Sequence, residues 1–247
     1  MSTTVEKWPT FMSKLTRQQE IAERTMSFSF EKPAGWTFKA GQFIDMTLLD
    51  PSETDAEGNK RGFSIASAPH EATLMVATRM RDTAFKRILH SMSLGNSVKI
   101  EGPFGNLTLH NNVERAAVLL AGGIGITPFR SIVFSAAKAK LPQRIFLFFS
   151  NRRPEDASFL QELQQLEQEN ANYKLIATMT KMEKSNKAWT GETGEINKEL
   201  LSRYLTDAKS PIYYIAGPPK MVKSLHEMLS KMGVDDDDIR TEEFTGY

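Results

Sequence analysis

The sequence predicts an α+β protein of two domains, an N-terminal antiparallel β domain and a C-terminal α/β domain with a parallel sheet. Between residues 20 and 109, short alternating segments are separated by turn residues, which is typical of an antiparallel barrel or sandwich. From about residue 116 onward, apolar strand-like runs alternate with helical stretches, which predicts parallel strands covered by helices. We place the domains at residues 1–110 and 111–247.

The first domain is predicted to contain short strands and a single helix. The predicted strands are 25–30, 42–49, 63–67, 73–79 and 97–101. Turn residues at 33–35, 50–60 and 93–96 separate them. The helix is predicted at 83–92.

The second domain is predicted to alternate strand and helix. Its predicted strands are 116–121, 144–150, 173–178, 212–216 and a short one at 240–244. Its predicted helices are 128–139, 157–170, 197–205 and 219–231. Apolar side chains on one stripe of the second helix indicate a helix that faces the core.

Composition narrows the functional classes. The formal net charge of +1 gives no reason to expect nucleic acid as the main partner. We find no run of about 18 apolar residues and no secretory pattern, so we expect no membrane span and a cytoplasmic location. The chain has no cysteine, which excludes disulfides and thiolate-bound clusters, and its 4 histidines are scattered, so we expect no metal site.

A glycine-rich segment after the strand at 116–121 has the features of a phosphate-binding loop. Gly122, Gly123 and Gly125 permit a tight turn, and Thr127 and Pro128 suit the first turn of a helix. A pyrophosphate there would meet free N–H groups and the positive end of the helix dipole. A purely structural turn is the alternative interpretation.

A second cluster follows the strand at 212–216 and contains Gly217, Pro218, Pro219 and Met221. In open α/β sheets, ligands bind beyond the carboxyl ends of the strands. We therefore expect both turns to line one crevice, although Pro218 and Pro219 could also simply start a helix.

The segment Arg61-Gly62-Phe63-Ser64 offers a guanidinium, an aromatic face and a hydroxyl within four residues. Arginine can bind a diphosphate bidentately, phenylalanine can stack on a ring, and serine can hydrogen-bond a ring nitrogen. Because strand side chains alternate, a planar ligand would contact all three groups only by lying along the strand. Extended phosphorylated aromatics such as flavins suit this geometry.

At these residues the chain resembles the ferredoxin–NADP reductase-like flavoprotein superfamily. Its flavin motif resembles Arg61-Gly62-Phe63-Ser64, and its barrel-closing turn resembles Gly102-Pro103-Phe104-Gly105. The loops at 122–128 and 217–221 resemble its pyrophosphate loop and the turn under its nicotinamide. The resemblance implies an N-terminal six-stranded antiparallel Greek-key β-barrel with one capping helix, which holds FAD. It also implies a C-terminal Rossmann-like α/β domain that holds NADPH or NADH.

The resemblance also implies roles for residues of the first domain. Arg61 would contact the FAD phosphates, Phe63 would stack on the isoalloxazine, and Ser64 would approach its N5 atom. The backbone N–H groups of Thr83, Ala84 and Phe85 would meet the FAD pyrophosphate at the start of the lone helix. Thr83 could also be an ordinary residue of a helix N-terminus.

We name Ser64, Thr127 and Glu243 as the candidate catalytic residues. By resemblance, Thr127 lies near the nicotinamide edge. Phe244 or Tyr247 would cover the other face of the isoalloxazine, as an aromatic residue at the C-terminus does in some members. A frayed tail is the alternative interpretation of the final Gly-Tyr.

The choice between NADPH and NADH rests on the segment after the strand at 144–150. In Ser150-Asn151-Arg152-Arg153, an arginine could accommodate a 2′-phosphate, and we name Ser150 and Arg152 as coenzyme-binding residues, whereas Glu155 or Asp156 could favour an unphosphorylated ribose. The arginine pair could equally belong to a solvated loop. We favour NADPH. The chain departs from the superfamily at Ala216, where a cysteine is common, and at Phe63, where tyrosine is commoner.

The resemblance implies a FAD-dependent NAD(P)H oxidoreductase that passes electrons to a separate carrier, namely a ferredoxin, flavodoxin or rubredoxin, which could serve an oxygenase. Basic residues of the barrel and of the 79–81 region would attract an acidic carrier. Two alternatives stay open. One is a reductase of free flavin or quinone, and the other is a flavin-binding regulatory subunit without turnover.

Overall fold

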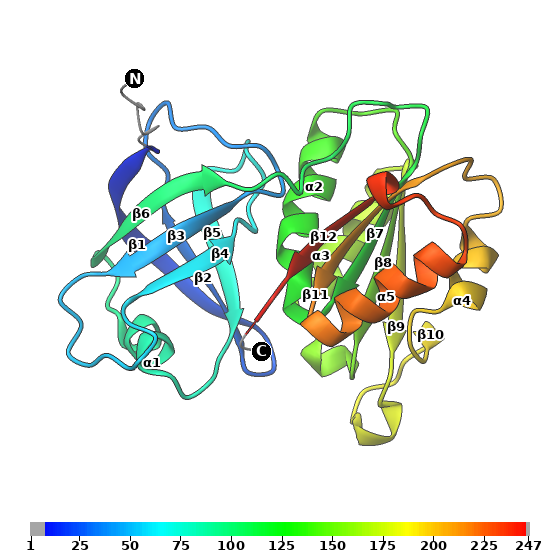
Figure 1. Ribbon diagram of the computed structural model, residues 1–247. Coiled ribbons are helices and arrows are strands. Elements are labelled where there is room, and N and C mark those ends of the chain that lie inside the picture. The colour runs from blue at the N-terminus through cyan, green and yellow to red at the C-terminus, as the bar shows by residue number, and fades with distance from the viewer. Residues whose placement is uncertain (1–7, 246–247) are drawn as a thin grey trace.

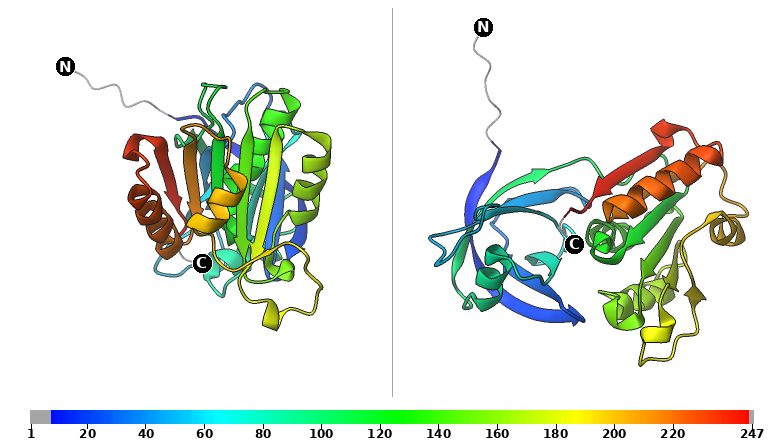
Figure 2. Two further views of the ribbon diagram at one scale, coloured as in Figure 1. Left: turned by 90° about the vertical axis from the view of Figure 1, so that its right-hand side faces the viewer. Right: turned by 60° about the horizontal axis from the view of Figure 1, so that its bottom comes forward.

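The computed structural model describes residues 8–245, which form two domains side by side. Figure 1 shows the β domain on the left and the α/β domain on the right, and Figure 2 shows the same arrangement from two other directions. The last strand, β12 (Ile239–Glu243), runs from the α/β domain toward the β domain. The C-terminal segment therefore reaches the region between the two domains.

The first domain is a six-stranded antiparallel sheet with the strand order β4-β3-β6-β1-β2-β5, which confirms the predicted fold. Just beyond β4, the Ala66 N–H donates to the carbonyl of Met75 in β5 over 2.8 Å, which joins the two edges of the sheet into a barrel. The strands are β1 (Thr10–Ala22), β2 (Thr25–Glu31), β3 (Phe43–Leu48), β4 (Lys60–Ser64), β5 (Thr73–Arg79) and β6 (Ser97–Phe104).

The 13-residue strand β1 was not predicted from the sequence. Only Ser13 and Leu15 of this strand are buried, and the rest of it carries mostly polar side chains. The strand is held by backbone pairing to β2 on one side and β6 on the other. Because few of its side chains enter the core, its sequence carries little of the alternating signal on which the prediction depends.

The helix α1 (Ala84–Ser91) covers one end of the barrel, as predicted. The side chain of Thr83 caps its first turn by accepting from the Lys86 N–H over 3.4 Å. Phe85 and Leu89 are buried in the barrel core. The helix N-terminus is thereby fixed beside β4, which carries Arg61 and Phe63.

The second domain is a parallel sheet with the strand order β10-β9-β8-β7-β11-β12. Its other strands are β7 (Ala117–Gly122), β8 (Ile145–Asn151), β9 (Tyr173–Met179), β10 (Glu192–Thr193) and β11 (Ile212–Gly217). Its helices are α2 (Ile126–Lys138), α3 (Leu160–Glu169), α4 (Lys198–Tyr204) and α5 (Pro219–Lys231). Short 3-10 turns lie at Gly123–Gly125, Pro154–Asp156, Met182–Lys184 and Asp236–Asp238. The two-residue strand β10 is the element of this sheet that we did not predict.

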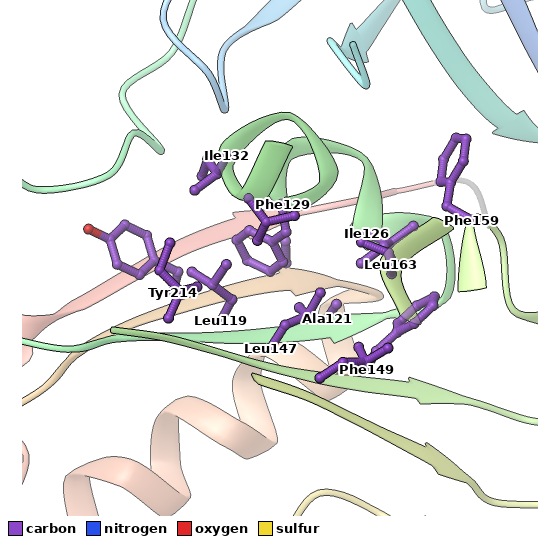
Figure 3. Packing of buried hydrophobic residues seen from close by; sticks show 14 of the residues in the cluster. Leu119, Ala121, Ile126, Phe129, Ile132, Leu147, Phe149, Phe159, Leu163 and Tyr214 are labelled. Atoms are coloured by element: carbon purple, nitrogen blue, oxygen red, sulfur yellow. The ribbon is translucent and has the colours of Figure 1, made fainter. Parts of the chain in front are cut away.

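Helices cover both faces of the parallel sheet. On one face, α2 and α3 pack against β7, β8 and β11, and Figure 3 shows Phe129 and Ile132 of α2 over Leu119 and Tyr214. On the other face, α4 and α5 enclose a second apolar cluster. The chain moves outward from β7 through β8 and β9 and then returns to β11 on the other side of β7. The strand order therefore reverses between β7 and β11, where an open α/β sheet forms its ligand crevice.

The predicted boundary at 110/111 lies between the last barrel strand, which ends at Phe104, and β7, which begins at Ala117. The exact division stays a prediction. His110 is buried in this segment, where its N–H and Nδ1 both contact the Tyr214 hydroxyl. Hydrogen bonds therefore attach the connecting segment to the parallel sheet.

The carboxyl ends of β7 and β11 pack so closely that Gly125 has no space for a side chain. A Cβ atom there would lie 2.2 Å from the Ala216 carbonyl oxygen. We expect Gly125→Ala to reduce the free energy of unfolding by about 3 kcal/mol, since backbone atoms must move. Gly62→Ala is the control, because its Cβ would meet nothing nearer than 3.6 Å. Chemical denaturation measures both, and equal stability of the two variants would contradict the close packing.

Candidate active site

The loop between β7 and α2 forms the open end of the switch-point crevice. Gly123 adopts a φ of 53°, and a Cβ atom on it would meet nothing within 4 Å, so its backbone faces open space. Gly122 lies against Met221, whose sulfur would be 2.2 Å from a Cβ on Gly122. The backbone of this loop can therefore approach a ligand closely, as a phosphate-binding turn requires.

The turn between β11 and α5 lies against this loop. Pro218 precedes α5, and Pro219 is the first residue of the helix. A Cβ on Gly217 would lie 3.2 Å from the backbone of Gly122, so the two strand ends are in contact. The sequence prediction that both turns line one crevice describes this arrangement.

A cavity of about 520 Å³ opens where these turns face the barrel. Its walls come from the Gly122–Ile124 backbone, the β11–α5 turn, the end of β8 and the barrel. Gly122, Gly123, Ser150, Arg152, Pro218, Met221 and Phe244 are predicted site residues that line it, and Thr25 and Arg79 are its barrel residues. The cavity thus lies between the domains, with the glycine loop on one side and barrel strands on the other.

Asn151 at the end of β8 is a cavity residue that the sequence analysis missed. Its side chain is buried, and neither Oδ1 nor Nδ2 has a hydrogen-bond partner among residues 8–245. A buried amide without partners costs about 1–3 kcal/mol, so this side chain is a candidate ligand-binding group. In the sequence, nothing distinguishes this neutral amide from an ordinary polar loop residue.

Some of the charged residues next to Asn151 are held by ion pairs or hydrogen bonds to described residues, and others are not. Arg153 is bound to Asp156 over 2.9 Å and to Glu23 over 2.8 Å. Glu155 accepts from the Ser185 hydroxyl and the Asn186 N–H. Arg152 is exposed and forms no ion pair with another described residue. The acidic residues that could have favoured an unphosphorylated ribose are therefore occupied, whereas Arg152 is available to a ligand.

In the predicted flavin motif, Arg61 is held by its own chain. Its Nη1 donates to the carbonyls of Glu57, Gly58 and Lys60, and its Nη2 lies 2.9 Å from the Glu57 carboxylate. The guanidinium also stacks over the ring of Phe85 at 5.2 Å. The loop before β4 thus wraps the side chain that we predicted to bind phosphate.

Asp55 connects Arg61 with the N-terminus of α1. Its Oδ2 accepts from the Ala84 N–H over 3.0 Å, and its Oδ1 lies 3.4 Å from Arg61 Nη2. Partial desolvation would raise the pKa of Asp55, but hydrogen bonds from the Ala84 and Glu57 amides and the Arg61 charge outweigh it and lower the pKa. A carboxylate here contacts the same donors that were predicted to bind a diphosphate. Arg61 and the Ala84 N–H therefore form a site that fits a diphosphate, and the Asp55 carboxylate occupies the position of that anion.

Phe63 is only 5% exposed and belongs to the barrel core, with its ring centroid 5.8 Å from that of Phe85. Strand alternation correctly placed Arg61 and Phe63 on the same side of β4, because both contact Phe85. Stacking of a planar ring on Phe63 stays a proposal that requires the residues over its face to move.

Ser64 and Glu242 connect the two domains beside these motifs. The Ser64 hydroxyl donates to Glu242 Oε1 over 2.6 Å, and Glu242 lies in β12 opposite Ala216 of β11. Burial raises the pKa of Glu242, although the hydrogen bond from Ser64 opposes the rise. A carboxyl group with a raised pKa between two domains is a candidate acid–base group.

Comparisons with known proteins agree with this geometry. Residues 119–227 match the family model of the oxidoreductase NAD-binding domain. One relative, from Yersinia pseudotuberculosis, belongs to the Na(+)-translocating NADH-quinone reductase and is 32% identical over 245 residues, which cover 93% of this chain and 59% of that protein. Its counterpart in Methylococcus capsulatus is 28% identical and is covered over 49% of its length. The chain therefore spans about half to three fifths of these curated relatives.

Solved structures share the complete two-domain fold. A ferredoxin NADP+ reductase from Neisseria gonorrhoeae superimposes with a TM-score of 0.77 at 22% identity and covers 95% of this chain and 98% of its own. A cytochrome P450 reductase from Amycolatopsis gives a TM-score of 0.80 at 18% identity over 97% of this chain and 71% of its own. The chain therefore has the two-domain fold of these reductases.

Two of the predicted catalytic residues, Thr127 and Glu243, do not line the cavity, and their catalytic roles stay predictions. Thr127 is 1% exposed, and its hydroxyl donates to the Ile124 carbonyl over 3.0 Å, so it stabilises the first turn of α2 and does not face the cavity. Glu243 is exposed, whereas Glu242 contacts Ser64. The sequence showed two adjacent glutamates but not which of them faces the barrel.

Some of the other predicted site residues line the cavity and others do not. Phe244 lines the cavity, and its N–H donates to the Gly217 carbonyl over 2.9 Å. Gly125 lies against the Ala216 carbonyl, and Pro128 is a buried residue of the first turn of α2. Tyr247 lies outside the described residues, and so its predicted contact with the flavin stays a prediction. Among residues 8–245, we find no cluster of acidic or histidine side chains suited to a metal and no helix able to cross a membrane.

The raised pKa of Glu242 predicts a pH-dependent loss of stability. Because the folded-state pKa exceeds the unfolded-state value, its stabilising contribution is complete at low pH and is lost as pH rises through the raised pKa. We expect Glu242→Gln to lose less stability than the original chain over this rise, since glutamine cannot ionise. Thermal unfolding between about pH 4 and pH 9 measures the difference.

Glu243→Gln is the matched control for this experiment, because Glu243 is exposed and adjacent in the same strand. It should keep the pH dependence of the original chain. If Glu242→Gln and the original chain lose the same stability as pH rises, ionisation of Glu242 does not destabilise the folded state, which would contradict the prediction.

Proposed function

We propose that this chain is a FAD-dependent NADPH oxidoreductase that passes electrons from the coenzyme through the flavin to a separate carrier protein. The observation that carries the proposal is the interdomain cavity, in which the glycine loop and β11–α5 turn face Arg79 and Thr25 of the barrel. Such a cavity allows a nicotinamide coenzyme on one domain to meet a flavin on the other. The superfamily fold and the NAD-binding family model support the same function.

Arg61 and the Ala84 N–H would hold the FAD diphosphate, after its negative charge displaces Asp55 from both donors. Ser64 would hydrogen-bond the ring edge, and Phe63 would stack on the ring once its face is uncovered. When bound, FAD supplies hydride acceptance and the release of single electrons. The role of the protein is to position the two rings and exclude water.

The nicotinamide coenzyme would lie across the Gly122–Ile124 loop, with its diphosphate on the backbone of the loop at the start of α2. Arg79, Arg152 and Lys220 line the same cavity, and none of the three forms an ion pair with another described residue. Asp156, which is paired with Arg153, and Glu195 also line the cavity. The three cations outnumber these two carboxylates and favour a ligand with more phosphate charge, which supports NADPH over NADH. Asn151 adds a hydrogen-bonding group for the coenzyme.

Glu242 and Ser64 would handle the proton that accompanies electron transfer. Burial raises the pKa of Glu242, and the Ser64 hydroxyl donates to its Oε1 over 2.6 Å, so the two side chains form one hydrogen-bonded pair. A proton that reaches Ser64 Oγ from a bound ligand would be matched by transfer of the Ser64 hydroxyl proton to the Glu242 carboxylate, and the reverse sequence would return it.

The acceptor is proposed to be a ferredoxin, flavodoxin or rubredoxin. The chain contains 0 cysteines, so it holds no thiolate-bound cluster to receive the electrons. Similar structures include the ferredoxin reductase in a carbazole 1,9a-dioxygenase, which supports a carrier and an oxygenase system. Quinone is the second candidate acceptor, because the curated relatives are named as part of an NADH-quinone reductase.

An anaerobic absorbance titration of the FAD-reconstituted chain tests the proposal. Addition of NADPH should bleach the flavin band, and the reduced protein should then reduce a carrier faster than it reduces a quinone. Bound flavin that neither NADPH nor NADH bleaches would favour the regulatory alternative. Failure to bind flavin at all would overturn the proposal.

Arg152→Gln should weaken NADPH binding about tenfold or more and leave NADH binding nearly unchanged. Hydrogen bonds to charged groups contribute about 1.5–3 kcal/mol, which corresponds to at least a tenfold change. Dissociation constants from flavin absorbance changes measure both. Arg144→Gln, just before the opposite end of β8, is the control and should keep the preference. An equal loss for both coenzymes would contradict contact with the 2′-phosphate.

Asp55→Asn should tighten FAD binding about tenfold, since it removes a negative charge that competes for Arg61 and Ala84. Fluorescence quenching of FAD measures the dissociation constant. Glu53→Gln, in the same loop but paired with Arg87, is the control and should bind FAD as before. Weaker FAD binding by Asp55→Asn would show instead that Asp55 supports the binding conformation of Arg61.

A further inference from the structure

A buried arginine joins the helix behind the coenzyme loop to the barrel. Arg130 of α2 is 5% exposed. Its Nη1 and Nη2 contact the Glu71 carboxylate over 2.9 and 3.2 Å. Its Nε and Nη2 contact Glu162 over 2.6 and 3.0 Å. The guanidinium therefore binds one carboxylate from each domain in a two-pronged geometry.

The same part of α2 holds the barrel backbone directly. Arg130 Nη1 donates to the Ala66 carbonyl over 2.8 Å, and the buried Ser131 hydroxyl donates to the Ser67 carbonyl over 2.7 Å. Ala66 and Ser67 follow Ser64 by two and three residues. The helix that begins after the glycine loop is thus attached to the continuation of the flavin motif.

These contacts can fix the distance between the glycine loop and the barrel. Arg130 lies about one turn into α2, so the helix transmits its position to the glycine loop without a flexible joint. The rings of Phe134 and Phe159, 4.5 and 5.2 Å from the guanidinium, restrict its side chain further. A guanidinium enclosed in this way has a single favourable position.

A second interdomain ion pair differs in its surroundings. Arg153 lies 2.8 Å from Glu23 of the barrel, and the two side chains are 22% and 50% exposed. An exposed pair of this kind contributes little, because water and salt screen it. Arg153 therefore offers a matched interdomain arginine that lacks the burial of Arg130.

We propose that Arg130 is a positioning residue for hydride transfer, which sets the spacing between the nicotinamide held by the glycine loop and the flavin held by β4. This inference rests on the proposed function. Arg130 contacts neither ring and acts through Ala66 and Glu71 on the strand that carries Ser64. Because a misplacement of about 1 Å can slow a reaction about a hundredfold, a loosened contact reduces the rate before it reduces coenzyme binding.

The test compares Arg130→Lys with Arg153→Lys in the FAD-reconstituted chain. Lysine keeps the charge but cannot bind two carboxylates and a carbonyl with a planar fork. Anaerobic stopped-flow reduction by NADPH gives the limiting rate and the coenzyme dissociation constant separately. For Arg130→Lys, we expect a limiting rate reduced at least about tenfold, with a dissociation constant within about twofold of the original. Arg153→Lys should leave both unchanged.

The long-wavelength charge-transfer absorbance between flavin and nicotinamide gives a second readout, since it depends on the overlap of the two rings. It should weaken in Arg130→Lys and persist in Arg153→Lys. Ser131→Ala removes one hydrogen bond from the same contact and should shift both readouts in the same direction, even if Arg130→Lys does not fold. Unchanged rate and absorbance in the folded variants would overturn the positioning role. Absence of bleaching in the original chain would instead overturn the proposed function, and the positioning role with it.

Discussion

The close approach of the β7 and β11 ends is the constraint on which the rest of the site depends. Gly125 allows the glycine loop to lie against the backbone of Ala216 and Gly217, and Gly122 leaves space for the Met221 side chain. This contact places the glycine loop and the proline turn on one wall of a single cavity. On its other side β11 pairs with β12, which carries Glu242, and Phe244 just after this strand lines the cavity. A side chain at Gly125 would therefore disturb all of these groups together.

The arginines near the site differ in how carboxylates compensate their charge. Arg61 and Arg130 are both enclosed by carboxylates, but they differ in what surrounds them. Arg130 is buried between two glutamates and two aromatic rings, which suits a permanent contact. Arg61 is held by a loop whose Asp55 also binds the Ala84 amide, which suits a contact that an incoming anion can replace. The cavity residues Arg79 and Arg152 form no ion pair with any residue between 8 and 245.

Much of the fold could be predicted from the sequence, because strands buried on both faces are continuous apolar runs and the helices show apolar stripes. The parallel strands and α1 follow this rule. Strand β1 does not, since only Ser13 and Leu15 of its side chains are buried and backbone pairing holds it. The two turns of the site were predictable because glycine and proline restrict backbone geometry locally. The partner of Ser64 was not, because which of two adjacent glutamates faces the barrel depends on the register of β12. Thr127 and Asn151 likewise depend on side-chain direction, which periodicity alone does not give.

The most direct test of the central claim is a crystal structure of the chain with FAD and NADP+ bound. The account predicts the FAD diphosphate on Arg61 and the α1 N-terminus with Asp55 displaced, and the NADP+ diphosphate on the Gly122–Ile124 loop. It also predicts the flavin ring edge at Ser64, with Glu242 within hydrogen-bond reach of that serine. A flavin bound elsewhere, or Asp55 still holding Arg61 and Ala84 beside a bound FAD, would contradict it.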